Sequence, residues 1–131
     1  MSVLTLLLLY IAFRIKHYIC DFGLQTNWIA ANKGLPSQDG NKALLFHILP
    51  HAVGTTLIAL AFTPSLWWLG IVDFLVHWLI DKGKAMLTLA MKWKTTDRWF
   101  WLTLGFDQEL HNFTHLAYMV YMIYYAGGVV L

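Results

Sequence analysis

Long apolar stretches separated by short polar ones dominate the chain, and they predict helices that cross a membrane. A span needs about 20 largely apolar residues. The predicted helices run over about residues 3–27, 43–62, 66–84 and 98–125. Turn-forming residues between Asn32 and Lys42 separate the first two helices, and the tight connection 63–65 joins the second to the third. The pattern predicts an all-α, polytopic membrane protein with four transmembrane helices in one bundle.

The segment after the third predicted helix has two interpretations. Ala85 to Met91 is apolar but flanked by lysines, so it either extends the third helix or lies in the membrane interface. Residues 95–97 then offer an N-cap for the fourth helix. Because no internal repeat, low-complexity tract or domain boundary interrupts the chain, we expect residues 1–131 to form a single integral membrane domain.

The composition agrees with a membrane protein. Hydrophobic residues make up 59% of the 131 residues and charged residues only 12%, whereas a soluble domain of this length needs more polar surface. The apolar run Val3 to Phe13 lacks a basic region before it and a small-residue cleavage site after it, so we interpret it as a retained helix. No P-loop, dinucleotide fingerprint, nucleophile elbow or zinc finger is present, and a few lysines do not indicate a nucleic-acid partner.

Basic residues near the helix ends predict the orientation. They flank the first and third connections: Lys33, Lys42, Lys82, Lys84, Lys92, Lys94 and Arg98. The connection between the second and third helices carries none, and neither does either terminus. Because loops rich in lysine and arginine stay in the cytoplasm, we expect both termini on the periplasmic side of a bacterial inner membrane.

Every histidine has a histidine or aspartate partner four residues away, and these pairs fall on four separate apolar segments. The pairs are His17/Asp21, His47/His51, His77/Asp81 and Asp107/His111, with Asp73 and His115 extending the last two. Four residues turn an α-helix by about 400°, so both side chains of a pair leave the same face. The predicted topology puts all four pairs between the cytoplasmic face and the bilayer centre, which predicts one shared polar site.

The chemistry of these pairs indicates a metal site. Ionisable side chains inside a membrane cost about 2.5 to 3.5 kcal/mol each and normally face a bundle interior. The predicted ligands are His17, Asp21, His47, His51, His77, Asp81, Asp107 and His111. Nitrogen and oxygen donors favour zinc, with iron or manganese as alternatives. A single His/Asp pair also fits a structural ion pair, and Asp73 and His115 equally fit hydrogen bonds between helices or a proton relay.

Four motifs follow one another from residue 17 to residue 111. They read His17-x3-Asp21-Phe22-x-Leu24-Gln25, His47-x3-His51, His77-x2-Ile80-Asp81-x2-Lys84 and Asp107-Gln108-x2-His111. This ordered set resembles a family of small bacterial and phage integral membrane proteins known only as a domain of unknown function. The resemblance implies a multi-pass membrane protein without an established reaction. A more distant likeness is to bacterial membrane proteins described as metal-dependent hydrolases.

Three functions remain open. The first is a metal-dependent hydrolase that acts on a lipid or lipid-linked substrate from the cytoplasmic leaflet, with Asp107 or Asp21 as the base. Asp81 is a poorer base because Lys82 and Lys84 are close enough to hold it as a structural ion. The predicted substrate-binding residues are Gln25, Lys33, Lys84 and Gln108. The second function is a metal or proton carrier, or a small non-enzymatic membrane subunit. The third is a di-iron oxidase, although the adjacent histidines of many such enzymes are lacking.

Overall fold

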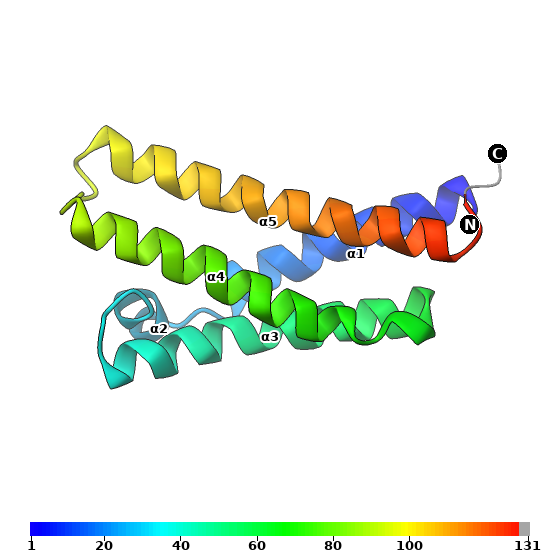
Figure 1. Cartoon of the computed structure of the whole chain (residues 1–131), viewed down its shortest axis with the longest axis horizontal. Coiled ribbons are helices and arrows are strands. Elements are labelled where there is room, and N and C mark those ends of the chain that lie inside the picture. Colours follow the sequence, from blue (N-terminus) through cyan, green and yellow to red (C-terminus); the bar gives the residue numbers. More distant parts are fainter. Residues whose placement is uncertain (129–131) are drawn as a thin grey trace.

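The computed structural model describes residues 1–128, which form helices joined by short turns (Figure 1). The α-helices of this part of the chain are α1 (Val3–Tyr18), α2 (Asn27–Asn32), α3 (Gln38–Phe62), α4 (Leu69–Ala90) and α5 (Arg98–Tyr125). A π-helical turn, Ile19–Gly23, extends α1, and a 3-10 turn, Pro64–Leu66, precedes α4. The described residues contain no β-strand, which confirms the all-α prediction.

The long helices α1, α3, α4 and α5 run along a common axis (Figure 1). The start of α1, the end of α5 and the connection between α3 and α4 lie at one end of the bundle, which we call the terminal end. There the Met1 ammonium donates to the backbone carbonyl of Gly128 (2.7 Å). α2 and the connection between α4 and α5 lie at the opposite end, which we call the basic end because the lysine-bearing connections meet there.

Side-chain caps determine where the first three helices begin. Ser2, Thr26 and Ser37 precede α1, α2 and α3, and each side-chain oxygen accepts the backbone N–H three residues later. The cap at Ser37 starts α3 inside the predicted loop 32–42, so the predicted start at residue 43 is wrong. Asp97 precedes α5 as predicted, but its carboxylate accepts the N–H of Lys94 (2.7 Å) and does not cap the helix.

Two further predicted boundaries are wrong. The first predicted helix, 3–27, ends at Gly23, a poor helix former that is the last residue of the π-helical turn, and α2 starts anew after its own cap. The third predicted helix, 66–84, begins at Leu69 and continues to Ala90 as α4. Of the two interpretations of the segment after residue 84, the extension of the helix is confirmed, and this segment is rich in alanine, leucine and methionine, which favour helix. The fourth predicted helix, 98–125, matches α5 at both ends.

Two segments of the described chain, Val3–Gly23 and Gln38–Phe62, are long and apolar enough to cross a membrane by length and composition. The sequence pattern predicts four. α4 and α5 do not meet the same criterion, because charged and polar side chains such as Asp73, Asp81 and Asp107 interrupt them. The chain is therefore all-α with two helices suited to a membrane on composition alone.

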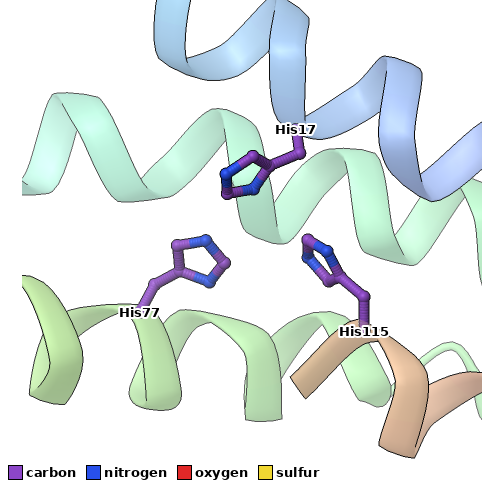
Figure 2. A group of neighbouring side chains, drawn as sticks. All are labelled: His17, His77 and His115. Carbon is purple, nitrogen blue, oxygen red and sulfur yellow. The ribbon is translucent and has the colours of Figure 1, made fainter. Parts of the chain in front are cut away.

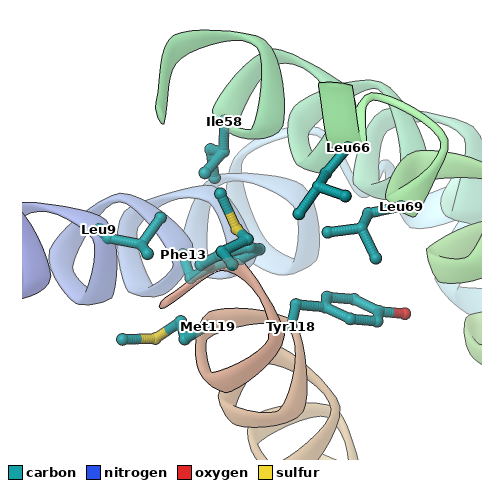
Figure 3. Packing of buried hydrophobic residues seen from close by; sticks show 8 residues of the cluster. Leu9, Phe13, Ile58, Leu66, Leu69, Tyr118 and Met119 are labelled. Atoms are coloured by element: carbon teal, nitrogen blue, oxygen red, sulfur yellow. The ribbon is translucent and has the colours of Figure 1, made fainter. Parts of the chain in front are cut away.

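An apolar core fills the terminal end of the bundle (Figure 3). Its buried residues come from α1, α3, the 3-10 turn, α4 and α5: Leu9, Phe13, Ile58, Leu66, Leu69, Tyr118, Met119 and Met122. Closer to the basic end, the residues that face the interior are mostly histidine, aspartate and lysine. The bundle interior is therefore divided along its length into an apolar part and a polar part.

Gly70 lets α4 lie directly against α3. A Cβ atom at Gly70 would overlap the hydroxyl oxygen of Thr56 and lie 2.7 Å from the carbonyl oxygen of Ala52. No larger residue fits at this point without moving the two helices apart. The contact lies about one turn before Asp73 and two turns before His77, so it also sets how closely these side chains approach α3.

We expect Gly70→Ala to lower the free energy of unfolding by about 1–3 kcal/mol, because the added methyl group overpacks the α3–α4 contact. Unfolding of the detergent-solubilised protein by heat or SDS, followed by circular dichroism, measures the change. Gly83→Ala on the same helix is the control, since a Cβ atom there meets nothing within 4 Å. Equal destabilisation by both variants would show that the close approach at Gly70 is unimportant.

Candidate metal centre

The polar part of the interior gathers ten histidine and aspartate side chains from all four long helices and the π-helical turn. All six histidines are buried, with a relative exposure of at most 3%. Asp73, Asp81 and Asp107 are buried as well, and the side chain of Asp21 is 12% exposed. Groups buried this deeply require polar partners, and here they are one another's partners.

The first donor group consists of His17, Asp21 and His51. Nε2 of His17 lies 3.2 Å from Oδ2 of Asp21, and Nε2 of His51 lies 3.1 Å from Oδ1 of the same carboxylate. Gln108 holds this carboxylate from α5, because its Nε2 donates to Oδ2 of Asp21 (3.1 Å). One donor atom of each group member lies within 4.8 Å of the other two, a spacing at which one metal ion can be bound.

The second donor group consists of Asp81, Asp107 and His111. Nε2 of His111 lies 3.3 Å from Oδ1 of Asp81 and 3.5 Å from Oδ1 of Asp107. These donor atoms also lie within 4.8 Å of one another. Lys84 donates to the remaining oxygen of Asp107 (3.1 Å), so this carboxylate is held between α4 and α5.

The lysines of α4 do not hold Asp81, contrary to the sequence-based expectation. Lys84 pairs with Asp107, and Lys82 donates to the side-chain oxygen of Asn41 (3.3 Å). Lys82 leaves the helix about 100° away from Asp81, whereas Lys84 lies only about 60° from it and is directed across to Asp107 on α5. The closest contacts of Asp81 are instead to His47 and His111.

His47 lies between the two donor groups. Its Nε2 is 3.6 Å from Oδ1 of Asp21 and 3.3 Å from Oδ2 of Asp81, and Lys33 Nζ lies 3.0 Å from the same nitrogen. An ammonium group only donates hydrogen bonds, so Lys33 requires a lone pair on Nε2, whereas ionised carboxylates require a proton there. No single tautomer of His47 satisfies both. A metal ion bound through Nε2 would take this lone pair and be shared with the carboxylate oxygens, and the Lys33 ammonium would then turn its donors to another acceptor in the cavity.

His77 belongs to a third group with His17 and His115, and the three rings point toward one another (Figure 2). The ring of His77 stacks on that of His111, with 4.1 Å between the centroids. Its Nδ1 lies 3.1 Å from Oδ1 of Asp73, so a proton on Nδ1 leaves the lone pair of Nε2 free. Within residues 1–128, this Nε2 has no hydrogen-bond partner.

Lys16 reaches into the third group, and the sequence interpretation did not include it. Its ammonium donates to Oδ2 of Asp73 and to Nε2 of His115, both at 3.0 Å. Thr55 donates its hydroxyl to the same carboxylate oxygen (2.7 Å). The stem of Lys16 crosses α3 at Gly54, where a Cβ atom would lie 2.7 Å from its Cγ. The ammonium supplies the positive charge here and occupies the lone pair that His115 would give to a metal.

A cavity of about 380 Å³, which we call the chamber, opens onto both donor groups. The predicted ligands that line it are Asp21, His47, Asp81, Asp107 and His111. The predicted substrate-binding residues line it as well: Gln25, Lys33, Lys84 and Gln108. Burial lowers the pKa of the Lys33 ammonium, and the nearby Asp81 carboxylate acts in the opposite direction.

The structure brings together all eight residues that the sequence predicts as metal ligands. Six of them form the first two donor groups, His47 lies between these groups, and His77 stacks behind the second. The metal-binding role of these residues stays a prediction. Asp73 and His115 lie outside the first two groups and pair with Lys16.

The fold and the site define a class of protein, an all-α bundle with membrane-compatible helices around a buried histidine and aspartate cluster. The chain belongs to the DUF3307 family, described as a protein of unknown function, whose match covers residues 5–128. The match includes all three groups, and it agrees with the resemblance to a domain of unknown function. Comparisons with curated proteins and with solved structures gave no match.

We expect Lys16→Met to lower the free energy of unfolding by about 3–5 kcal/mol, because the Asp73 carboxylate would stay buried without its cation. The double variant Lys16→Met/Asp73→Asn should regain a large part of this loss, since no unpaired charge remains. A double-mutant cycle of SDS unfolding measures the coupling. Purely additive effects of the two substitutions would contradict a buried ion pair.

Proposed function

We propose that this protein is a membrane-embedded metal-dependent hydrolase that acts on a lipid or lipid-linked substrate. The observation that carries the proposal is the pair of three-residue donor groups beside one chamber. Structural zinc sites are closed by four protein ligands, whereas catalytic sites offer three and keep a position for water or substrate. Two groups of three beside a cavity fit the catalytic arrangement.

The side chains of α4 and α5 support a bundle of four membrane-spanning helices. Their histidines and aspartates are buried in the interior. Their exposed faces carry large apolar side chains, among them Ile71, Leu75, Leu79, Phe106, Phe113 and Val120. Helices with polar residues inside and apolar residues outside suit lipid surroundings, where ionisable groups must face the bundle interior. The direction of their side chains therefore supports both helices as spans, although their mean composition does not meet the criterion.

The donor atoms support zinc as the bound ion, with iron or manganese next. The first group offers two imidazoles and one carboxylate, and the second offers one imidazole and two carboxylates. Zinc accepts such mixed nitrogen and oxygen sets in varied geometry. A bound ion of this kind lowers the pKa of its water towards 7 and polarises the bond that is cleaved.

The contacts favour Asp107 over Asp21 as the base. Both oxygens of Asp21 are engaged, Oδ1 by His51 and Oδ2 by Gln108. Lys84 holds Asp107 through Oδ2, and Oδ1 makes no hydrogen bond within residues 1–128. Because Asp107 also lines the chamber, its Oδ1 can accept a proton from water when it stays off the metal. Asp81 and His111 then remain as the ligands of the second group. Asp21 is then better suited as a ligand.

A metal or proton carrier is the second candidate. Lys16, Asp73 and His115 extend the polar interior toward the terminal end, as a carrier requires. The apolar core follows directly, however, and Leu9, Leu66 and Met122 are at most 2% exposed there. This closure supports a site reached from the basic end rather than a polar path through the whole bundle.

Purified protein incubated with zinc and freed of excess metal should retain a stoichiometric amount, measured by inductively coupled plasma mass spectrometry. His51→Ala should lose most of that metal, because it removes a nitrogen from the first donor group. His115→Ala is the matched control and should lose much less, because Lys16 occupies its Nε2. Equal metal content in the wild type and His51→Ala would show that His51 is not a ligand.

The orientation is tested by labelling single cysteines with a membrane-impermeant maleimide in intact bacterial cells. Ser65→Cys and Lys94→Cys place exposed thiols at opposite ends of the bundle, while the native Cys20 is buried. With a cytoplasmic basic end, Ser65→Cys should react in intact cells and Lys94→Cys only after permeabilisation. The reverse pattern would overturn the orientation and, with it, access from the cytoplasmic leaflet.

A further inference from the structure

An apolar groove lies beside the chamber, between α4 and α5. The groove has a volume of about 360 Å³. Its lining is mostly apolar: Leu79, Ile80, Leu87, Phe106 and Leu110. Lys84 and Asp107 line both the groove and the chamber. A polar cavity with two lysines therefore adjoins an apolar one that opens on the flank of the bundle.

The charge of the chamber complements an anion once a metal is bound. Its two lysines and three aspartates together carry one negative charge when ionised. One divalent ion changes this sum to one positive charge, and two ions change it to three. Lys33 and Lys84 each direct one hydrogen bond to the site, to His47 and Asp107. Because an ammonium group has three donors, both lysines retain donors for a ligand.

We propose that the substrate is a lipid phosphate, an amphiphile with a phosphoryl head group and a hydrocarbon chain. This inference rests on the proposed metal-dependent hydrolase and names its substrate class. The head group lies in the chamber between Lys33 and Lys84, beside the donor groups. The chain lies in the groove between α4 and α5 and continues into the surrounding lipid.

The reaction of such a phosphomonoester consumes one water molecule. The water oxygen bonds to phosphorus while the bond between phosphorus and the lipid oxygen breaks. One proton of the water moves to the lipid oxygen, so the products are a lipid alcohol and inorganic phosphate. Asp107 lies at the junction of chamber and groove, where it can take this proton from the water and return it to the leaving oxygen.

Two glycines allow a matched test of the groove. Gly83 lines the groove, and a Cβ atom there would meet nothing within 4 Å, so a leucine side chain can fill the groove without disturbing the fold. Gly105 on α5 is equally open but lines neither the groove nor the chamber. Gly83→Leu and Gly105→Leu therefore add the same apolar bulk to helices at sites that differ in their relation to the groove.

The experiment measures binding of three probes to zinc-loaded protein in detergent by native mass spectrometry: palmitoyl lysophosphatidic acid, palmitoylglycerol and inorganic phosphate. The wild type should bind the lysophosphatidic acid at least about tenfold more tightly than either other probe. Gly83→Leu should weaken that binding about tenfold and leave inorganic phosphate unaffected, while Gly105→Leu should change neither. Lys33→Gln should weaken both phosphate-bearing probes and spare palmitoylglycerol.

Two results would overturn the proposal while the metal stays bound. One is equal affinity for lysophosphatidic acid and palmitoylglycerol, which would show that the protein does not recognise the phosphate group. The other is an equal effect of Gly83→Leu and Gly105→Leu on binding of the lysophosphatidic acid, which would show that the hydrocarbon chain does not lie in the groove. The protein could retain no metal while the probe preference and the Gly83→Leu effect persist. That result would contradict the metal-dependent hydrolase but support a binding site for a lipid phosphate.

Discussion

The arrangement of this bundle depends on keeping ionisable side chains out of apolar surroundings. Ten histidines and aspartates, together with Lys16, Lys33 and Lys84, are joined in the interior by contacts of 3.0 to 4.0 Å between helices and within them. Because a buried ionisable group without a polar partner is costly, no long helix can rotate away without losing several of these contacts. The polar network therefore holds α1, α3, α4 and α5 in one mutual orientation, in addition to the apolar core at the terminal end.

This inward polarity explains why α4 and α5 do not meet the compositional criterion for a membrane span. A hydropathy average weighs Asp73 or Asp107 as if it faced the surroundings, although both are at most 3% exposed. α3 meets the criterion because its two interior histidines are flanked by long apolar runs. α4 and α5 contribute three ionisable groups each to the same interior, so the mean hydropathy of these helices falls although their outer faces stay apolar. The direction of a side chain, rather than its count, decides whether such a helix suits lipid.

The spacing of histidine and aspartate was sufficient to predict that these side chains gather in one part of the interior. It could not predict which pairs meet, because the four-residue period determines the face of one helix but not the rotation and height of its neighbours. Asp21 thus contacts His51 of α3 as closely as His17 of its own segment. Lys16 was missed for a related reason. One residue before His17 corresponds to about 100° around the helix, and only its long stem across Gly54 brings the ammonium to Asp73.

Access to the site is asymmetric, and a hydrolase with a lipid substrate requires this asymmetry. The apolar core closes the terminal end, whereas a hollow of about 230 Å³ beside α2 shares Lys33 and Lys84 with the chamber at the basic end. Water and released phosphate are polar and need a route of that kind, while a hydrocarbon chain needs the apolar groove between α4 and α5. Lys84 borders all three cavities. For the proposed hydrolase, the two routes would meet beside Asp107, the position at which water and the lipid oxygen would exchange a proton.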